Sequence, residues 1–137
     1  MGALVKFLIM ANVVFAASGT IDGTNKYAWS ENAGWVNFGT SQGNVIVSDT
    51  ELTGYAWGEN IGWISLNCSN TSSCATVNYK IANTTLGVLS GYAWNENAGW
   101  INFSPGVGSD PIINTTNGQF SGYAWCENVG WINFNCS

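Results

Sequence analysis

The sequence predicts an all-β protein built from four tandem repeats. A twelve-residue phrase, Tyr-Ala-Trp-x-Glu-Asn-x-Gly-Trp followed by three further residues, occurs at residues 27–38, 55–66, 92–103 and 123–134. All eight tryptophans belong to these copies, as the pairs Trp29/Trp35, Trp57/Trp63, Trp94/Trp100 and Trp125/Trp131. Self-similarity of this kind predicts one supersecondary unit per copy, which needs its neighbours to bury an apolar face.

Each copy of the phrase predicts a β-hairpin. An apolar and aromatic run lies on either side of the turn phrase Glu-Asn-x-Gly, which is typical of a hairpin with a four- or five-residue loop. Asparagine and glycine tolerate the positive φ angles that close such loops. The two tryptophans of a copy flank the loop, so we expect them to meet across the strands as an aromatic clasp.

A further strand-like stretch precedes three of the copies and ends in a Ser/Thr-Gly turn. These stretches lie at residues 44–48, 77–81 and 111–113. Each unit then has two to three short strands in a period of about 31 residues, less than the roughly 40 to 45 of a propeller blade. We therefore favour an elongated or sandwich-like stack of units. A closed barrel or a small propeller is the alternative.

The alternation of residues 89–94 predicts which side chains share a face. Leu89, Gly91 and Ala93 should point to one side of the strand, and Ser90, Tyr92 and Trp94 to the other. A face of small residues allows another backbone or sheet to approach closely.

Residues 1–17 predict a secretory signal peptide. Lys6 precedes an apolar run at residues 7–15, and small residues follow at Ala16 and Ala17. The run is shorter than the roughly 20 apolar residues of a membrane-spanning helix, although an uncleaved anchor or a pilin-like helix remains an alternative. We therefore expect export, a single β-repeat domain at residues 18–137, a secreted or cell-surface location, and no stable membrane span after cleavage.

The charge of the chain excludes some partners. It has three lysines, no arginine, no histidine and a net charge of −5. Nucleic acid is bound chiefly through lysine and arginine, so we expect no nucleic-acid partner. The same deficit disfavours binding to an anionic membrane surface.

The four cysteines predict disulfides, because an exported chain with an even number of cysteines usually pairs them. Four cysteines allow three connectivities. We favour Cys68–Cys74, which enclose a short polar stretch, and Cys126–Cys136, which flank the fourth copy. Cys136 follows its motif as Cys68 follows the second, so a truncated array in which Cys136 has lost a downstream partner stays open. A zinc site is disfavoured because the chain has no histidine.

The phrase Gly-Tyr-Ala-Trp-x-Glu-Asn-x-Gly-Trp-Ile-x-Phe, preceded by a Leu-Ser/Thr-Gly turn, resembles the tandem tryptophan-rich repeats of secreted or surface bacterial proteins, many of them uncharacterised. The resemblance covers most of residues 27–136. It implies an exported, multi-copy surface module and brings no activity with it. The first copy departs from the pattern, with Asn25 and Lys26 at the turn, as expected of a capping repeat.

Catalysis is the function that the residues favour least. Without histidine, acid–base chemistry would fall to carboxylates. The four motif glutamates stand at equivalent positions in equivalent turns, whereas an acid–base pair needs two different environments. They are Glu31, Glu59, Glu96 and Glu127. We expect no enzyme activity and no cofactor.

Our first expectation is a structural or adhesive surface module, able to pair with itself or with other surface proteins. The alternative is a carbohydrate-binding module, because aromatic rings stack on sugars while glutamate and asparagine hydrogen-bond to them. Its candidate ligand-binding residues are the eight tryptophans, the four motif glutamates and the motif asparagines Asn32, Asn60, Asn97 and Asn128.

Two considerations qualify the binding alternative. Cross-strand tryptophans are more often core residues than binding platforms, so exposed indoles would favour sugar binding and buried ones a scaffold. Calcium is a weaker option, because no Asp-x-Asp-x-Asp-Gly loop occurs, although rows of glutamates from stacked units could attract a cation.

Overall fold

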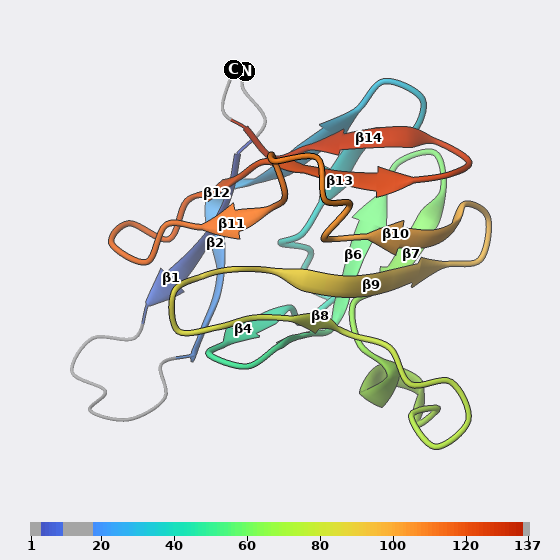
Figure 1. Cartoon of the computed structure of the whole chain (residues 1–137), viewed down its shortest axis with the longest axis horizontal. Coiled ribbons are helices and arrows are strands. Elements are labelled where there is room, and N and C mark those ends of the chain that lie inside the picture. Colours follow the sequence, from blue (N-terminus) through green and yellow to red (C-terminus); the bar gives the residue numbers. More distant parts are fainter. Residues whose placement is uncertain (1–3, 10–17, 136–137) are drawn as a thin grey trace.

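The computed structural model describes residues 4–9 and 18–135 and is all-β, as predicted. Its strands are β1 (Leu4–Ile9), β2 (Ser18–Ser30), β3 (Gly34–Asn37), β4 (Ile46–Ser48), β5 (Leu52–Thr53), β6 (Tyr55–Gly58), β7 (Gly62–Ser65), β8 (Ile81–Ala82), β9 (Ser90–Asn95), β10 (Gly99–Asn102), β11 (Ile112–Ile113), β12 (Phe120–Ser121), β13 (Tyr123–Cys126) and β14 (Gly130–Asn133). One short 3-10 helix, η1 (Cys68–Thr71), lies between β7 and β8 (Figure 1). No helix among the described residues is long and apolar enough to cross a membrane.

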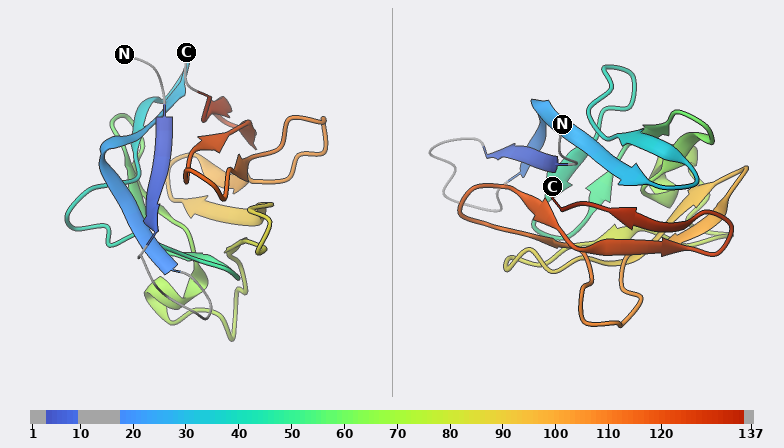
Figure 2. Two further views of the ribbon diagram at one scale, coloured as in Figure 1. Left: turned by 90° about the vertical axis from the view of Figure 1, so that its left-hand side faces the viewer. Right: turned by 90° about the horizontal axis from the view of Figure 1, so that it is seen from above.

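Four hairpins form the walls of a closed eight-stranded barrel. They are β2–β3, β6–β7, β9–β10 and β13–β14, one from each copy of the phrase. Neighbouring hairpins pair antiparallel, and β14 also pairs with β2, so the sheet has no free edge there. Figure 2 shows these first and last hairpins side by side. The elongated or sandwich-like stack that we favoured is therefore wrong, and the closed-barrel alternative is correct.

The same register at every junction explains the closure. Val36 pairs with Gly58, Ile64 with Asn95, Ile101 with Cys126 and Ile132 with Ser30. In each case the residue after the second tryptophan of one hairpin faces the residue after the first tryptophan of the next. Equal steps turn the sheet by equal amounts, and eight strands are enough to close a barrel with a side-chain-filled interior.

Small and branched side chains alternate in the barrel interior. The alanines Ala28, Ala56, Ala93 and Ala124 pair across the hairpins with Val36, Ile64, Ile101 and Ile132, and all eight are buried. Phe38, Leu66, Phe103 and Phe134 close the end away from the hairpin loops. This alternation lets eight strands pack around a narrow core.

The predicted faces of residues 89–94 are confirmed for four of the six residues, whereas Ser90 and Gly91 are both half-buried. Leu89 and Ala93 are buried, whereas Tyr92 is exposed and Trp94 is half-buried. Ala93 points into the barrel interior, where the strands approach one another.

The tryptophan clasps form as predicted, but on the outer wall. Each pair shares a cross-strand position, and the indole centroids lie 4.6 to 5.0 Å apart. Five of the eight indoles are between 36% and 43% exposed. The expectation that they form the core is wrong, because the alternation that points alanine into the barrel points tryptophan out of it.

An asparagine from each hairpin loop binds the loop of the preceding hairpin. The side-chain nitrogens of Asn60, Asn97 and Asn128 donate to the carbonyl oxygens of Ala33, Ile61 and Ala98, at 3.1, 2.9 and 2.9 Å. Asn32 donates to Val129 at 2.9 Å and completes the ring between the first and last hairpins. We call these four contacts the asparagine latches.

Short strands extend the hairpins at the end opposite the loops. β4 with β5, β8 with β9 and β11 with β12 contain parts of the three predicted upstream stretches. β1 supplies the counterpart for the first hairpin, because Val5 pairs with Lys26 as Ile81 pairs with Gly91, and both apolar side chains are buried. Residues 4–9 of the predicted signal peptide form β1 in this structure, so cleavage after residue 17 would remove that strand. Residues 1–3 and 10–17 lie outside the described residues, and the signal peptide stays a prediction.

Gly91→Ala should lower the free energy of unfolding by about 3 kcal/mol. Gly91 has a φ of 85°, and an added Cβ would meet the carbonyl oxygen of Lys80 well inside van der Waals contact. Gly106 has a similar φ of 82° with no atom within 4 Å of an added Cβ, so Gly106→Ala should cost only about 1 kcal/mol. Urea denaturation of both variants measures the difference, and equal losses would contradict the steric argument.

Candidate functional site

An aromatic groove of about 1040 Å³ lies on the outer wall between the second and third clasps. Trp57 and Trp63 form one side of it, and Trp94 and Trp100 the other. Its remaining lining residues are Gln42, Tyr55, Ile61, Gly62, Ser65, Thr71, Ser73, Val77, Tyr79, Glu96 and Asn97. We call this set the aromatic groove. It combines indole and phenol rings with hydroxyl, amide and carboxylate groups.

The rings of the groove hold one another in place. Trp57 and Trp63 pack edge to face with centroids 5.0 Å apart, and Tyr55 lies 5.9 Å from Trp63. On the other side Trp94 and Trp100 are 4.7 Å apart. Ring pairs in this geometry are favourable beyond the area that they bury. The clasps therefore offer exposed ring surface without needing to rearrange first.

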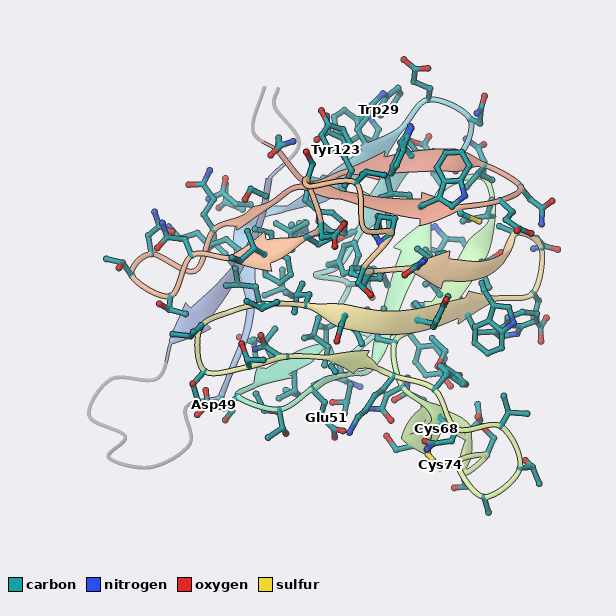
Figure 3. The ribbon with its side chains drawn as sticks, viewed as in Figure 1. Trp29, Asp49, Glu51, Cys68, Cys74 and Tyr123 are labelled. Atoms are coloured by element: carbon teal, nitrogen blue, oxygen red, sulfur yellow. A yellow bond between two sulfur atoms is a disulfide. The ribbon has the colours of Figure 1, made fainter. Side chains whose placement is uncertain are left out.

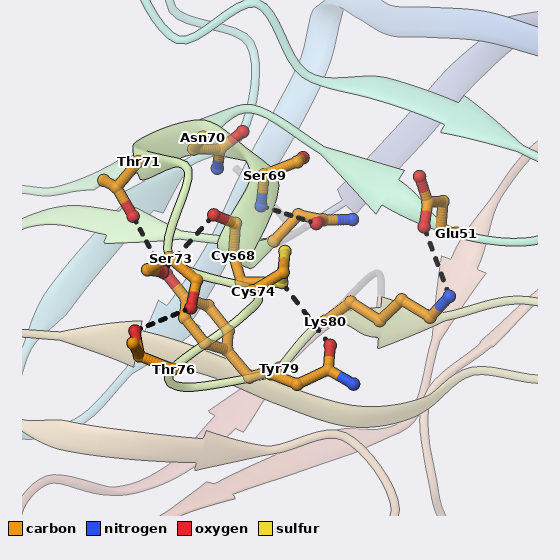
Figure 4. The surroundings of a disulfide bond; sticks show 12 residues. Glu51, Cys68, Ser69, Asn70, Thr71, Ser73, Cys74, Thr76, Tyr79 and Lys80 are labelled. Atoms are coloured by element: carbon orange, nitrogen blue, oxygen red, sulfur yellow. Dashed lines mark hydrogen bonds and ion pairs between the residues drawn. A yellow bond between two sulfur atoms is a disulfide. The ribbon is translucent and has the colours of Figure 1, made fainter.

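Residues 67–79 contribute Thr71, Ser73, Val77 and Tyr79 to the lining of the groove, and we call this segment the loop wall. The wall begins at η1 and is closed by the predicted Cys68–Cys74 disulfide, which is confirmed (Figure 4). Asn67 is buried at its base, where its side chain accepts from the Ser69 amide at 3.0 Å and donates to the Leu52 carbonyl oxygen at 3.0 Å. Figure 1 shows the segment projecting from one side of the barrel.

Two further residues, Tyr79 and Asn70, attach the loop wall to the barrel. The Tyr79 hydroxyl donates to Ser65 Oγ at 2.8 Å, and its ring lies 5.2 Å from that of Trp100. Asn70 Nδ2 donates to Ser65 Oγ at 3.0 Å and to the Gly54 carbonyl oxygen at 2.6 Å. Ser65 thus accepts hydrogen bonds from two residues of the loop wall.

Ser65 is also where the second copy of the phrase departs from the others. The equivalent residues are Asn37, Asn102 and Asn133, and each accepts a hydrogen bond from the amide two residues further on. These asparagines stabilise the turn that leaves the strand. Ser65 does not accept the corresponding backbone hydrogen bond, and its hydroxyl contacts the loop wall instead.

The groove carries little charge. Among the described residues that line it, Glu96 is the only charged one. Burial raises the pKa of the Tyr55 hydroxyl, and the neighbouring Tyr79 acts in the same direction. Tyr55 therefore stays protonated at neutral pH and donates to the Asn70 carbonyl oxygen at 3.4 Å.

The groove gathers six of the sixteen candidate ligand-binding residues: Trp57, Trp63, Trp94, Trp100, Glu96 and Asn97. The clasps Trp29–Trp35 and Trp125–Trp131 lie elsewhere on the barrel wall; Figure 3 labels Trp29. Trp131 lines a smaller hollow of about 240 Å³ with Val107, Ser109 and Tyr123.

Several candidate polar residues have structural partners. The motif asparagines make the latches, and Glu59 Oε2 accepts from the Trp35 amide at 2.6 Å. No group of three or more cysteine, aspartate or glutamate side chains within the described ranges is close enough to hold a metal ion. The rows of glutamates that the sequence left open for a cation are therefore not assembled in this part of the chain.

Sequence reasoning missed the residues of the loop wall and the tyrosines. Tyr55, Tyr79, Ser65 and Thr71 line the groove without being candidates. Two irregularities in the sequence could have pointed to these residues. The second copy has serine where the other copies have asparagine, and the longest spacing between copies follows this copy.

Cys126 does not form the disulfide that we favoured. It is a buried free thiol that donates to the Ala98 carbonyl oxygen at 3.2 Å, and Cys136 lies outside the described residues. Cys126 pairs with Gly130 beside the hairpin loop, whereas the last pair of β14 is Asn133 with Tyr123 at the other end of the hairpin. The chain therefore leaves this hairpin at the end remote from Cys126.

Comparisons with protein-family models, curated proteins and solved structures found no match to this chain.

Replacing both Cys68 and Cys74 by serine should lower the free energy of unfolding by about 2 kcal/mol, because the disulfide closes a short loop. Urea denaturation measures the change. Cys126→Ser is the matched control and should change stability by less than about 1 kcal/mol, since Ser30 occupies the equivalent buried position in the first hairpin. An unchanged double variant would contradict a stabilising role for the disulfide.

Proposed function

We propose that this protein is an exported carbohydrate-binding module without catalytic activity, and that the aromatic groove is its binding site. The observation that carries the proposal is the arrangement of two partly exposed tryptophan clasps on either side of one groove that also contains hydroxyl, amide and carboxylate groups. Indole faces stack on the apolar faces of sugar rings, while hydroxyl and amide groups hydrogen-bond to sugar hydroxyls.

The rigidity of the groove supports binding. The clasps are packed ring against ring, and the loop wall is held by a disulfide and by hydrogen bonds to Ser65. A preformed site loses little side-chain entropy when a ligand binds. A sugar chain would therefore meet surfaces that are already in position.

The carboxylates support binding without hydrolysis. Most glycoside hydrolases use two carboxyl groups about 5 to 10 Å apart. Glu96 is the one carboxylate among the described residues that line the groove.

An extracytoplasmic location is part of the proposal. The Cys68–Cys74 disulfide is compatible with an oxidising compartment, and the predicted signal peptide would direct the chain there. On a cell surface, binding to a polysaccharide would itself be adhesive. A surface module that only assembles with itself is the function left if no glycan binds.

Trp57→Ala should weaken binding to a polysaccharide at least about tenfold, or about 1.4 kcal/mol, because an indole that faces the sugar is lost. Trp29→Ala is the matched control, since Trp29 is 36% and Trp57 40% exposed and both form clasps. It should change affinity less than about twofold.

Affinity electrophoresis through gels that contain individual polysaccharides, followed by calorimetric titration, measures the effect. Retardation of the wild-type protein that Trp57→Ala abolishes would support the proposal. Binding to no polysaccharide, or equal loss in both variants, would overturn it.

A further inference from the structure

Resting on the proposed function, we infer that the aromatic groove selects glycans that carry free amino groups, such as glucosamine polymers, with Glu96 and the Trp94–Trp100 clasp receiving the ammonium group. Three features lead to this ligand class: an unpaired carboxylate, partly exposed indoles that line the same groove, and a surface that repels anions.

Glu96 is the carboxylate available to a ligand. It is exposed at the hairpin turn directly after β9 and lines the groove with Trp94. It has no hydrogen-bond or ion-pair partner within the described part of the chain. Its equivalent Glu59 differs, because its carboxylate binds the Trp35 amide. A free carboxylate in a binding groove pairs favourably with an ammonium donor.

The neighbouring clasp provides a second element of cation recognition. Trp100 is 41% exposed and is held by rings on several sides: Tyr79 lies 5.2 Å, Tyr92 6.1 Å and Trp94 4.7 Å from it. The face of an indole attracts cations, and tryptophan does so more strongly than other aromatic residues. The carboxylate and the indole ring thus both favour a positively charged group on the ligand.

The rest of the surface disfavours anionic sugars. The chain has three lysines against eight acids and a net charge of −5. Lys80 pairs with Glu51 at 3.3 Å, and Lys26 lies over the Tyr27 ring. None of the lysines is among the described residues that line the groove. Uronic acids and sulfated sugars would meet repulsion without a compensating base.

The test compares a glucosamine oligosaccharide with its fully N-acetylated counterpart of the same length, which has lost the charge. Calorimetric titration is carried out at mildly acidic pH and low ionic strength. The wild-type protein should bind the amino form about tenfold more tightly, and the preference should shrink as salt is added.

Glu96→Gln should remove this preference, so that the variant binds the amino and N-acetylated forms with affinities within about twofold of each other. Glu127→Gln is the matched control, because Glu127 is the exposed equivalent in the fourth hairpin and does not line the groove. It should leave the preference intact.

The outcomes separate the two proposals. Equal binding of both oligosaccharides, or a preference that survives Glu96→Gln, would overturn the ammonium site while the groove remains a glycan site. An equal effect of Glu127→Gln would assign the preference to general surface charge and would also overturn it. Binding to neither oligosaccharide would overturn the ammonium site. If no polysaccharide of the panel binds either, the proposed function is overturned as well.

Discussion

The pairing of β14 with β2 is the constraint on which the rest of this structure depends. It closes a sheet in which all four junctions between hairpins take the same register. The asparagine latches close the same ring at the loop end of the barrel. Each latch joins one hairpin loop to the next, and the fourth joins the last hairpin to the first. Closure removes the exposed strand edges that a row of hairpins would otherwise present.

Closure also determines which residues reach solvent. An eight-stranded barrel has room inside only for side chains that interlock closely. Alanine opposite valine or isoleucine meets this limit, whereas two indoles from every hairpin would not fit. The tryptophans therefore pack against one another on the outer wall, where they stiffen each hairpin and leave part of every clasp exposed.

The barrel wall has nearly fourfold symmetry, and the candidate site lies where that symmetry is broken. At the junction of the second and third hairpins, Ser65 replaces asparagine and the inserted loop wall rises beside two clasps. The Trp29–Trp35 and Trp125–Trp131 clasps belong to the regular part of the barrel wall. A scaffold of this kind keeps its fold through the regular positions and can acquire binding chemistry through one irregular segment, because the latches and the barrel core do not involve Ser65 or Tyr79.

The sequence by itself determined the local structure. The turn phrase identified the hairpins, their spacing put the tryptophans of each copy opposite one another, and two nearby cysteines identified the Cys68–Cys74 disulfide. Strand alternation correctly put Ala93 on one face and Tyr92 and Trp94 on the other, because that rule depends only on neighbours along the chain.

Only the tertiary structure decided which of those faces is inside. One face carries alanine and branched residues, and the other carries tryptophan and tyrosine. Because both faces are apolar, the sequence pattern does not distinguish the inner face from the outer one. It also decided closure, the free state of Cys126 and the aromatic groove. These depend on contacts between residues far apart in sequence, such as β14 with β2 and Tyr79 with Trp100, and local patterns do not specify such contacts.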